Sequence, residues 1–185
     1  RDIPLIKEIK DKTGLKIKIL LNEACLRNCP FRQMHYNYLS HQNTNSNLVL
    51  LSGILNDKFS EKIFVRDPRK IFSASFIPPS ALKYYADCVD YFKISTRDAP
   101  TYLVELRLKA YITQRFTGNL VSLLDCACLR PYYEYIDSRI LDRSGFFEKM
   151  IGCVIGCNEC GYCDQLMRKA VVTNSYFLNS DEPAK

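Results

Sequence analysis

The stretch Asp2–Pro30, "DIPLIKEIKDKTGLKIKILLNEACLRNCP", runs through a candidate helix and a candidate strand into a pair of cysteines. Apolar residues recur on one helical face between Ile3 and Ile9, which favours an amphipathic helix that ends at Gly14. Residues 15–21, "LKIKILL", alternate between polar and β-branched or aliphatic residues and predict a strand. The connection between the two is only a few residues long, as is typical of α/β units.

The same order of elements recurs downstream. "KIFSASF" at residues 70–76 favours a strand, "ALKYYADC" at 81–88 a short helix, and "VDYFKIS" at 89–95 another strand. A long helix is predicted over 101–116, with a stop at Gly118. Such alternation implies a parallel sheet with helices packed outside it. The strands expected to run parallel are Lys16–Leu21, Ile71–Ser75 and Tyr91–Ile94.

Three strands are too few to close a barrel, so we expect a partial TIM-type (β/α) barrel with two open edges. The chain opens with "RDIPLIKEIK", without an initiator methionine. We therefore expect an N-terminal barrel half in a longer protein, or self-association that covers the edges. Residues 1–118 would form the barrel part. Residues 119–185, interrupted at Pro131 and Gly145, would form a mostly helical, cysteine-rich extension.

The composition is that of a globular protein. Of 185 residues, 47% are hydrophobic and 25% charged, which argues against wholesale disorder. No apolar run approaches the roughly 18 residues that a membrane span needs. Nine cysteines, an odd number without a secretory signal, argue for reduced thiols or metal ligands rather than a disulfide framework. A cytoplasmic location is the corresponding expectation.

The net charge of +6 is placed unevenly along the chain. Residues 1–70 contain 13 Lys and Arg against 7 Asp and Glu, whereas residues 71–185 contain 13 of each. A basic region of this kind suits RNA or another anionic partner. The alternative is a solvated surface with spare lysines. No Gly-rich phosphate loop, Ser–His–Asp set or helical His-Glu-x-x-His occurs, which excludes the commonest nucleotide-binding, serine-hydrolase and zincin motifs.

The first candidate site directly follows the strand at 15–21. Ligands of parallel α/β folds bind at the carboxyl ends of the strands, and this is where Cys25 and Cys29 lie. Thiolates are soft, charged donors that suit zinc and iron–sulfur clusters. The two cysteines are candidate metal ligands on that ground, and structural thiols are the alternative.

The second candidate site is the segment "CVIGCNECGYC", in which Cys153, Cys157, Cys160 and Cys163 fall within 11 residues. The C-x2-C-x2-C core resembles the spacing that binds a cubane 4Fe–4S cluster. Because closely packed thiolates repel one another, a bound cation would stabilise this segment. We predict that the last three share one metal centre, with the 22–41 stretch beside it.

Two alternatives for this cysteine segment stay open. A pair from it together with Cys25 and Cys29 would make a zinc site, which usually consists of two separated cysteine pairs. The spacing of Cys153, Cys157 and Cys160 also matches the radical S-adenosylmethionine motif. That motif normally follows the first strand of its barrel, whereas this segment lies beyond the last predicted strand.

Basic side chains near the strand ends are candidate substrate-binding groups. Lys93 and Arg97 stand at the carboxyl end of the last predicted strand, where α/β barrels often bind phosphate or carboxylate. Pairing with Asp98 or Glu105 is the structural alternative. His35 is a candidate ligand or base, or a hydrogen-bonded structural residue.

Three passages resemble the collagenase-like peptidase family U-thirty-two. They are "LLNEACLRNCPFRQMHYNYLSH" at residues 20–41, "SFIPPSALKYYADCVDYFKISTR" at 75–97, and the long helix that contains "KAY". The resemblance covers about residues 2–117. It implies a TIM-like barrel, of which this chain would be the C-terminal portion.

The resemblance also implies an activity and a cofactor. Members are named for proteolysis, and several resemble cluster-bearing proteins that support oxygen-independent hydroxylation of RNA bases or quinone precursors. Their 4Fe–4S clusters use four cysteines, to which Cys25 and Cys29 correspond here, with the C-terminal cysteines as the source of the rest. The chain departs from some members in having no cysteine between Cys29 and Cys88.

The leading hypothesis is therefore an iron–sulfur enzyme that acts as a peptidase or modifies RNA or a small aromatic substrate. Arg32, His35, Lys93 and Arg97 would orient that substrate. The alternative is a non-catalytic, zinc-stapled module that binds RNA or a protein partner through its basic N-terminal part.

Overall fold

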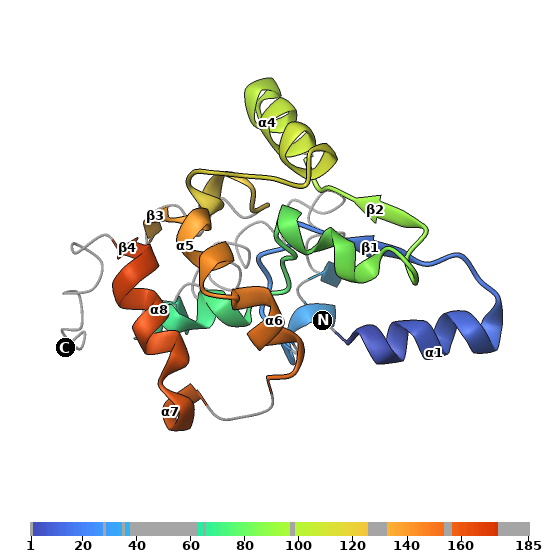
Figure 1. Cartoon of the computed structure of the whole chain (residues 1–185), viewed down its shortest axis with the longest axis horizontal. Coiled ribbons are helices and arrows are strands. Elements are labelled where there is room, and N and C mark those ends of the chain that lie inside the picture. Colours follow the sequence, from blue (N-terminus) through green and yellow to red (C-terminus); the bar gives the residue numbers. More distant parts are fainter. Residues whose placement is uncertain are drawn as a thin grey trace, which may run out of the picture.

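The computed structural model describes residues 2–27, 29–34, 36–37, 63–64, 66–96, 99–125, 133–153 and 157–173, with only the backbone at 157 and 158. In Figure 1, helix α1 extends to one side of the molecule and the C-terminal helix α8 lies on the opposite side. Within the described residues, no helix combines the length and apolar character that a membrane span requires.

The first predicted helix is confirmed as α1, Ile3–Thr13. The Asp2 carboxylate caps its start by accepting a hydrogen bond from the Leu5 amide at 3.2 Å. Gly14 ends it with φ of 64°, and its N–H donates to the Lys10 carbonyl. A left-handed residue at this position favours glycine, so the stop follows directly from the sequence.

Two of the three predicted strands are confirmed, and they pair in parallel. Strand β1, Lys18–Leu20, lies beside β2, Tyr91–Lys93, with Lys18 opposite Tyr91. The ladder continues past the last strand residue because the Leu21 amide donates to the Lys93 carbonyl at 2.9 Å. Whether this pair belongs to a TIM-type barrel stays a prediction.

The predicted strand Ile71–Ser75 is wrong. Residues Pro68–Ser73 form the 3₁₀ helix η2, and the Asp67 carboxylate accepts from the Arg69 amide at its start. An Asp-Pro step is a helix-start signal, because Asp caps and proline fits the first turn. That signal prevails over the alternation of "KIFSASF". The third strand is thus replaced by a helical turn that runs into the loop beside β1.

The helix predicted at 81–88 corresponds to the 3₁₀ helix η3, Pro79–Tyr85. The long helix is confirmed as α4, Thr101–Ile112, and stands at the top of the view in Figure 1. It ends before the predicted Gly118. The Thr113 hydroxyl donates to the Lys109 carbonyl, and Gln114 has a positive φ of 53°, which breaks the helical path.

The described residues after position 118 form several helices, and they also contain a small antiparallel sheet that we did not predict. Its strands are β3, Tyr133–Ile136, and β4, Val171–Thr173. Both strands fall in the part that was expected to be mostly helical, and the β-branched side chains of β4 suit a strand. The helical elements here are η4 (Leu120–Ser122), α5 (Ser138–Arg143), α6 (Phe146–Ile151), α7 (Cys157–Cys160) and α8 (Tyr162–Ala170).

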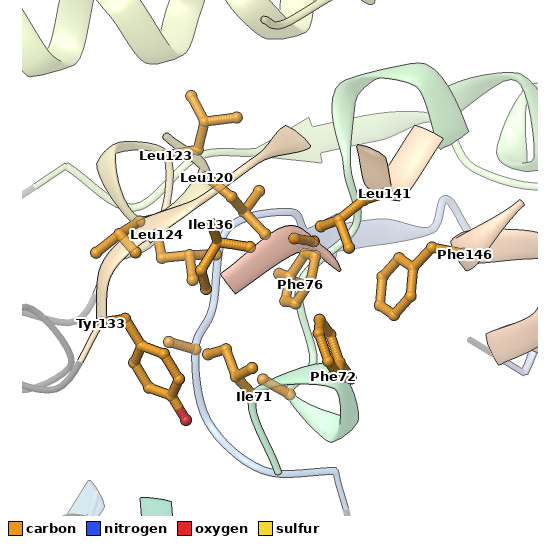
Figure 2. Close-up of a cluster of buried hydrophobic side chains, with 14 of the residues drawn as sticks. Ile71, Phe72, Phe76, Leu120, Leu123, Leu124, Tyr133, Ile136, Leu141 and Phe146 are labelled. Carbon is orange, nitrogen blue, oxygen red and sulfur yellow. The ribbon is translucent and has the colours of Figure 1, made fainter. Parts of the chain in front are cut away.

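Two hydrophobic clusters form the core. Figure 2 shows the larger one, in which the rings of Phe72, Phe76 and Phe146 face one another. The Phe76 and Phe146 rings stack with centroids 5.8 Å apart. The smaller cluster lies around Tyr85, Tyr111 and Phe147. Both clusters combine residues from each side of position 118, and the division into 1–118 and 119–185 stays a prediction.

Polar contacts fix helices α5 and α6 against η3. The Ser80 hydroxyl donates to the Asp142 carboxylate at 2.7 Å, and the Tyr84 hydroxyl donates to Glu148. Burial, opposed in part by the Ser80 hydrogen bond, raises the pKa of the Asp142 carboxyl above its usual value. The neutral form of Asp142 is therefore favoured by the fold.

Candidate active site

The loop that follows β1 is held by backbone hydrogen bonds along the segment after η2. The Ile77 amide donates to the Leu21 carbonyl at 2.7 Å, and the Ser75 amide donates to the Cys25 carbonyl at 2.8 Å. The Arg27 amide donates to the Ser73 carbonyl at 3.1 Å. The loop thus runs along a fixed partner, which limits the positions that its side chains can take.

Asn22, directly after β1, is fully buried and closes the carboxyl ends of the two strands. Its Nδ2 donates to the carbonyls of Ser95, at 2.9 Å, and of Leu123, at 3.1 Å. Its Oδ1 accepts from the Ser95 amide at 2.8 Å. Because all three hydrogen bonds described for this amide go to backbone, Asn22 has a structural role at the base of the site.

Arg107 of α4 is the second buried polar residue under the site, with 2% of its surface exposed. Its guanidinium donates to the carbonyls of Ser95 (3.2 Å), Ser122 (3.1 Å) and Leu124 (2.5 Å). Oδ1 of Asp125 lies 3.8 Å from Nη1 of Arg107, and this carboxylate balances part of the guanidinium charge. The planar fork of an arginine can bind several fixed carbonyls at once, so Arg107 joins α4 to the loops at the strand ends.

Above this base, Glu23, Arg32 and Tyr36 form a polar cluster, which we call the Glu23 cluster. The Tyr36 hydroxyl donates to one carboxylate oxygen of Glu23. Arg32 Nη2 lies 3.4 Å from the other oxygen and also donates to the Ser75 hydroxyl at 3.1 Å and the Leu26 carbonyl at 3.2 Å. The Glu23 side chain is only 15% exposed. The carboxylate is thus held between a cation and a phenol in a largely desolvated position.

The hydrogen bond to Glu23 is the main reason that the pKa of Tyr36 is raised to about 12, with burial adding to it. An ionised phenol would face the neighbouring carboxylate, so the neutral form is favoured. At neutral pH, Tyr36 therefore keeps a proton that it can donate.

Cys25 lies beside the same cluster, and its thiol is half-buried. Burial raises the pKa of Cys25, while the charge of Arg32 and its hydrogen bond to the thiol act in the opposite direction. Glu23 and Cys29 raise it further. The thiol of Cys25 is thus protonated at neutral pH, unlike the activated thiolates of cysteine nucleophiles. The Cys29 amide donates to the Leu26 carbonyl at 3.3 Å, so a tight turn brings the backbone of Cys29 back toward Cys25.

The C-terminal cysteines have different surroundings. Cys163 is buried in the larger core cluster, Cys153 packs against that cluster, and Cys160 is half-buried. The side chain of Cys157 lies outside the described residues. Among the side chains that are described, no three of the His, Cys, Asp and Glu type are arranged to hold a metal. The predicted centre of Cys157, Cys160 and Cys163 therefore stays a prediction.

The two candidate sites pack on one core. Leu26, next to Cys25, contacts the same cluster that contains Cys163. Helix η2 and α8 are joined by an ion pair in which Arg69 Nη1 lies 3.0 Å from Asp164. The cysteine segment and the Glu23 cluster therefore share a scaffold, although no contact between their thiols is described.

Two of the four predicted substrate-binding residues, Arg32 and Lys93, are described, and they lie in different surroundings. Arg32 belongs to the Glu23 cluster, whereas Lys93 is exposed on β2, where its carbonyl pairs with Leu21. His35 and Arg97 lie outside the described residues.

The sequence interpretation missed four residues of the site, Glu23, Tyr36, Ser75 and Arg107. Glu23 and Tyr36 lie within the stretch already singled out, one beside Asn22 and one four residues after Arg32. A single arginine among apolar neighbours in "TYLVELRLKAYI" was the available signal for a buried Arg107, because buried arginines are rare unless paired.

Comparison with known proteins gives one informative relative. The chain is 37% identical over 171 residues to a Methanocaldococcus jannaschii protein named "Uncharacterized protease". The match covers 92% of this chain and 50% of the relative, so the chain spans about half the length of that protein. No model of a known protein family matches the chain. No solved structure matches it. The chain is thus related over most of its length to a protein that bears a protease name.

Proposed function

We propose that the chain carries a catalytic site for peptide hydrolysis, formed by Glu23, Arg32 and Tyr36 at the end of β1. One observation carries this proposal: a largely buried carboxylate is held between a guanidinium and a protonated phenol at the carboxyl end of a parallel strand. A carboxylate that can accept a proton, placed beside a phenol that can donate a hydrogen bond, suits hydrolysis. The protease name of the archaeal relative supports the same reaction class.

In this proposal Glu23 is the general base. It takes a proton from water as the water oxygen forms a bond to the peptide carbonyl carbon, and the proton then passes to the leaving amine as the C–N bond breaks. When the substrate carbonyl is bound, the single Tyr36 hydroxyl hydrogen turns from Glu23 to the oxygen that becomes negative in the tetrahedral intermediate, and the Glu23 oxygen that it leaves accepts the proton from water. Arg32 keeps Glu23 oriented and adds positive charge beside the substrate oxygen.

Cys25 is assigned no nucleophilic role in this mechanism. Its raised pKa leaves the thiol protonated at neutral pH, and a thiol is a much weaker nucleophile than a thiolate. This distinguishes the proposed site from that of a cysteine peptidase.

The test is hydrolysis of an internally quenched peptide library by the purified chain. We expect Glu23→Gln to lower kcat by about 100-fold or more, in line with loss of a general base. Glu105→Gln, at an exposed position on α4, is the matched control and should keep full activity. Absence of turnover, or equal turnover by Glu23→Gln and the original chain, would overturn the proposal.

A second proposal concerns a cofactor, and the proximity of Cys25 and Cys29 favours it. We propose that these two cysteines are ligands of a 4Fe–4S cluster, with zinc as the alternative, completed from Cys153, Cys157, Cys160 and Cys163. When bound, such a cluster would supply the redox chemistry for the oxygen-independent hydroxylation, of RNA or a small aromatic substrate, that the family resemblance implies. Thiols lose protons when they bind metal. Because the pKa of the Cys25 thiol is raised, the affinity of the site for the metal should increase with pH.

Anaerobic purification followed by iron, zinc and acid-labile sulfide analysis tests this cofactor. Iron and sulfide in equal amounts, with visible charge-transfer absorbance, are expected. Cys160→Ala should abolish the metal content, whereas Cys88→Ala, at a buried thiol that bonds the Tyr85 carbonyl, should not. One zinc in a colourless protein would replace the cluster by the zinc alternative. Full metal content in Cys160→Ala would overturn the assignment of that ligand.

A further inference from the structure

Ser75 contacts the Glu23 cluster but has no role in the hydrolysis proposed above. Its neighbours Ala74 and Phe76 are 0% and 1% exposed and belong to the larger core cluster. Ser75 itself is partly exposed, and its hydroxyl meets the guanidinium of the Glu23 cluster. Its backbone is also fixed, since its amide donates to the Cys25 carbonyl at 2.8 Å. The core therefore holds this hydroxyl at the site.

The hydrogen of the Ser75 hydroxyl points away from Arg32. Arg32 Nη2 donates to Ser75 Oγ at 3.1 Å, and a guanidinium has no acceptor atom. The serine oxygen thus accepts this bond, and its single hydrogen remains for another partner. Among the described residues, no acceptor receives that hydrogen. In the free chain water can take this position, and a substrate oxygen can replace the water.

Ser75 and the Glu23 carboxylate are neighbours on one cationic nitrogen. Arg32 Nη2 lies 3.4 Å from Glu23 and 3.1 Å from Ser75 Oγ. A carbonyl group that is attacked by water at Glu23 therefore has its oxygen within the neighbourhood of the serine hydroxyl. The Tyr36 hydrogen must first turn away from Glu23 to reach that oxygen, whereas the Ser75 hydrogen needs no such change. A donor that is in place before the reaction stabilises developing charge without reorganisation.

We propose that Ser75 is a second catalytic donor of this site, whose hydroxyl binds the substrate carbonyl oxygen as negative charge develops on it. The water oxygen forms a bond to the carbonyl carbon, the electron pair of the C=O π bond moves to the oxygen, and Ser75 keeps its own proton throughout. Tetrahedral anions such as phosphinate peptides should accordingly bind the site tightly. This inference rests on the proposed hydrolysis and assigns a further residue to it.

The test measures hydrolysis of the quenched peptides by Ser75→Ala. We expect kcat to fall about 100-fold while KM changes less than about threefold, because the contact strengthens only in the transition state. A phosphinate peptide should bind this variant about 100-fold more weakly. Ser75→Thr keeps a hydroxyl and should recover most of the lost kcat. Ser73→Ala, at another partly exposed serine of the same segment, is the matched control and should keep full activity.

A measurement on Tyr36 separates this role from a structural one. If Ser75 only held Arg32 in place, its removal would also move Glu23 and shift the alkaline titration of Tyr36. We expect Ser75→Ala to leave the pKa of Tyr36 at about 12.

The outcomes distinguish this inference from the proposed hydrolysis. With Glu23→Gln inactive, full kcat in Ser75→Ala would overturn the role of Ser75 alone, and so would a lower kcat together with a shifted Tyr36 titration. A covalent fluorophosphonate adduct on Ser75, detected by mass spectrometry, would also overturn it, because the serine would then be a nucleophile. Absence of turnover by the original chain, or equal turnover by Glu23→Gln, would overturn the proposed hydrolysis and this inference with it.

Discussion

Asn22 and Ser95 are joined by two hydrogen bonds, from Asn22 Nδ2 to the Ser95 carbonyl at 2.9 Å and from the Ser95 amide to Asn22 Oδ1 at 2.8 Å. A side-chain amide presents the same donor and acceptor as a peptide group. Asn22 therefore continues the pairing of β1 and β2 beyond the point where the backbone of the first strand turns away. Glu23 follows immediately, so its position depends on this contact.

Asn22→Ala should destabilise the chain by roughly 3 kcal/mol, because it leaves buried backbone groups of Ser95 and Leu123 without their partner. Urea unfolding followed by circular dichroism measures the change. Asn37→Ala removes an exposed amide that bonds only Gln33 among the contacts described and should cost less than about 0.5 kcal/mol. Equal unfolding midpoints for the two variants would contradict the structural role of Asn22.

Arg107→Lys should also be strongly destabilising, by about 2–4 kcal/mol, although the charge is kept. A lysine has a single nitrogen and cannot reach three carbonyls in two different segments, so some of them lose their donor. Arg115→Lys at an exposed position is the control, with an expected change within about 0.5 kcal/mol. If both substitutions lower the free energy of unfolding equally little in chemical denaturation, the positive charge alone would account for the contribution of Arg107 to stability.

The ionisation of Tyr36 should depend on Glu23. The raised pKa of about 12 means that the folded chain favours the neutral phenol. Its stabilising contribution is therefore fully present below about pH 10, the ordinary tyrosine pKa, and is lost as pH rises through about 12.

Alkaline titration of tyrosinate absorbance, as the difference between the original chain and Tyr36→Phe, gives this pKa directly. In Glu23→Gln the Tyr36 pKa should fall back toward about 10, because the carboxylate no longer opposes ionisation. A titration that is the same with and without the Glu23 carboxylate would rule out this coupling.

The effect of Asp142→Asn on stability should be more favourable at neutral pH than at acid pH. Because the pKa of Asp142 is raised, the contribution of its neutral form is present below the ordinary aspartate pKa and is lost as pH rises through the raised value. Asparagine stays neutral throughout and keeps an oxygen that can accept from Ser80.

The difference in melting temperature between Asp142→Asn and the original chain should thus be more positive at pH 7 than at about pH 3. Asp87→Asn, at an exposed position, serves as the control. A difference that is constant, or larger in acid, would mean that Asp142 is not held in the way described.

Local sequence signals predicted the elements whose determinants lie within the element itself. Helix α1 has its capping Asp2 and its terminal Gly14 in the sequence, and β1 has a clear alternation. At Ile71–Ser75 the predicted strand is wrong because the Asp67–Pro68 helix start prevails over the alternation of apolar residues. Strand β4 was missed because it is three residues long and pairs with β3 more than thirty residues earlier, a tertiary contact that no local pattern reports.

The location of the site was easier to predict than its composition. A strand that ends at Asn22 predicts where candidate side chains gather, and Arg32, one of the residues predicted there, lies in the Glu23 cluster. Ser75 and Arg107 join the site only through folding, since they lie 43 and 85 positions away from Arg32 and Asn22. Their contribution depends on the positions of η2 and α4, which are set by the packing of the core.

The hydrogen bonds described for Asn22 and Arg107, which together form a clamp, join these two side chains to backbone atoms of the loops. The loops can consequently exchange their side chains during evolution without loosening their attachment, provided that the path of the backbone is kept. Residues such as Ser95, Ser122 and Leu124 are free to diversify as far as this clamp is concerned. The arrangement separates the backbone shape of the site from its side chains, so that related proteins could exchange those side chains on an unchanged frame.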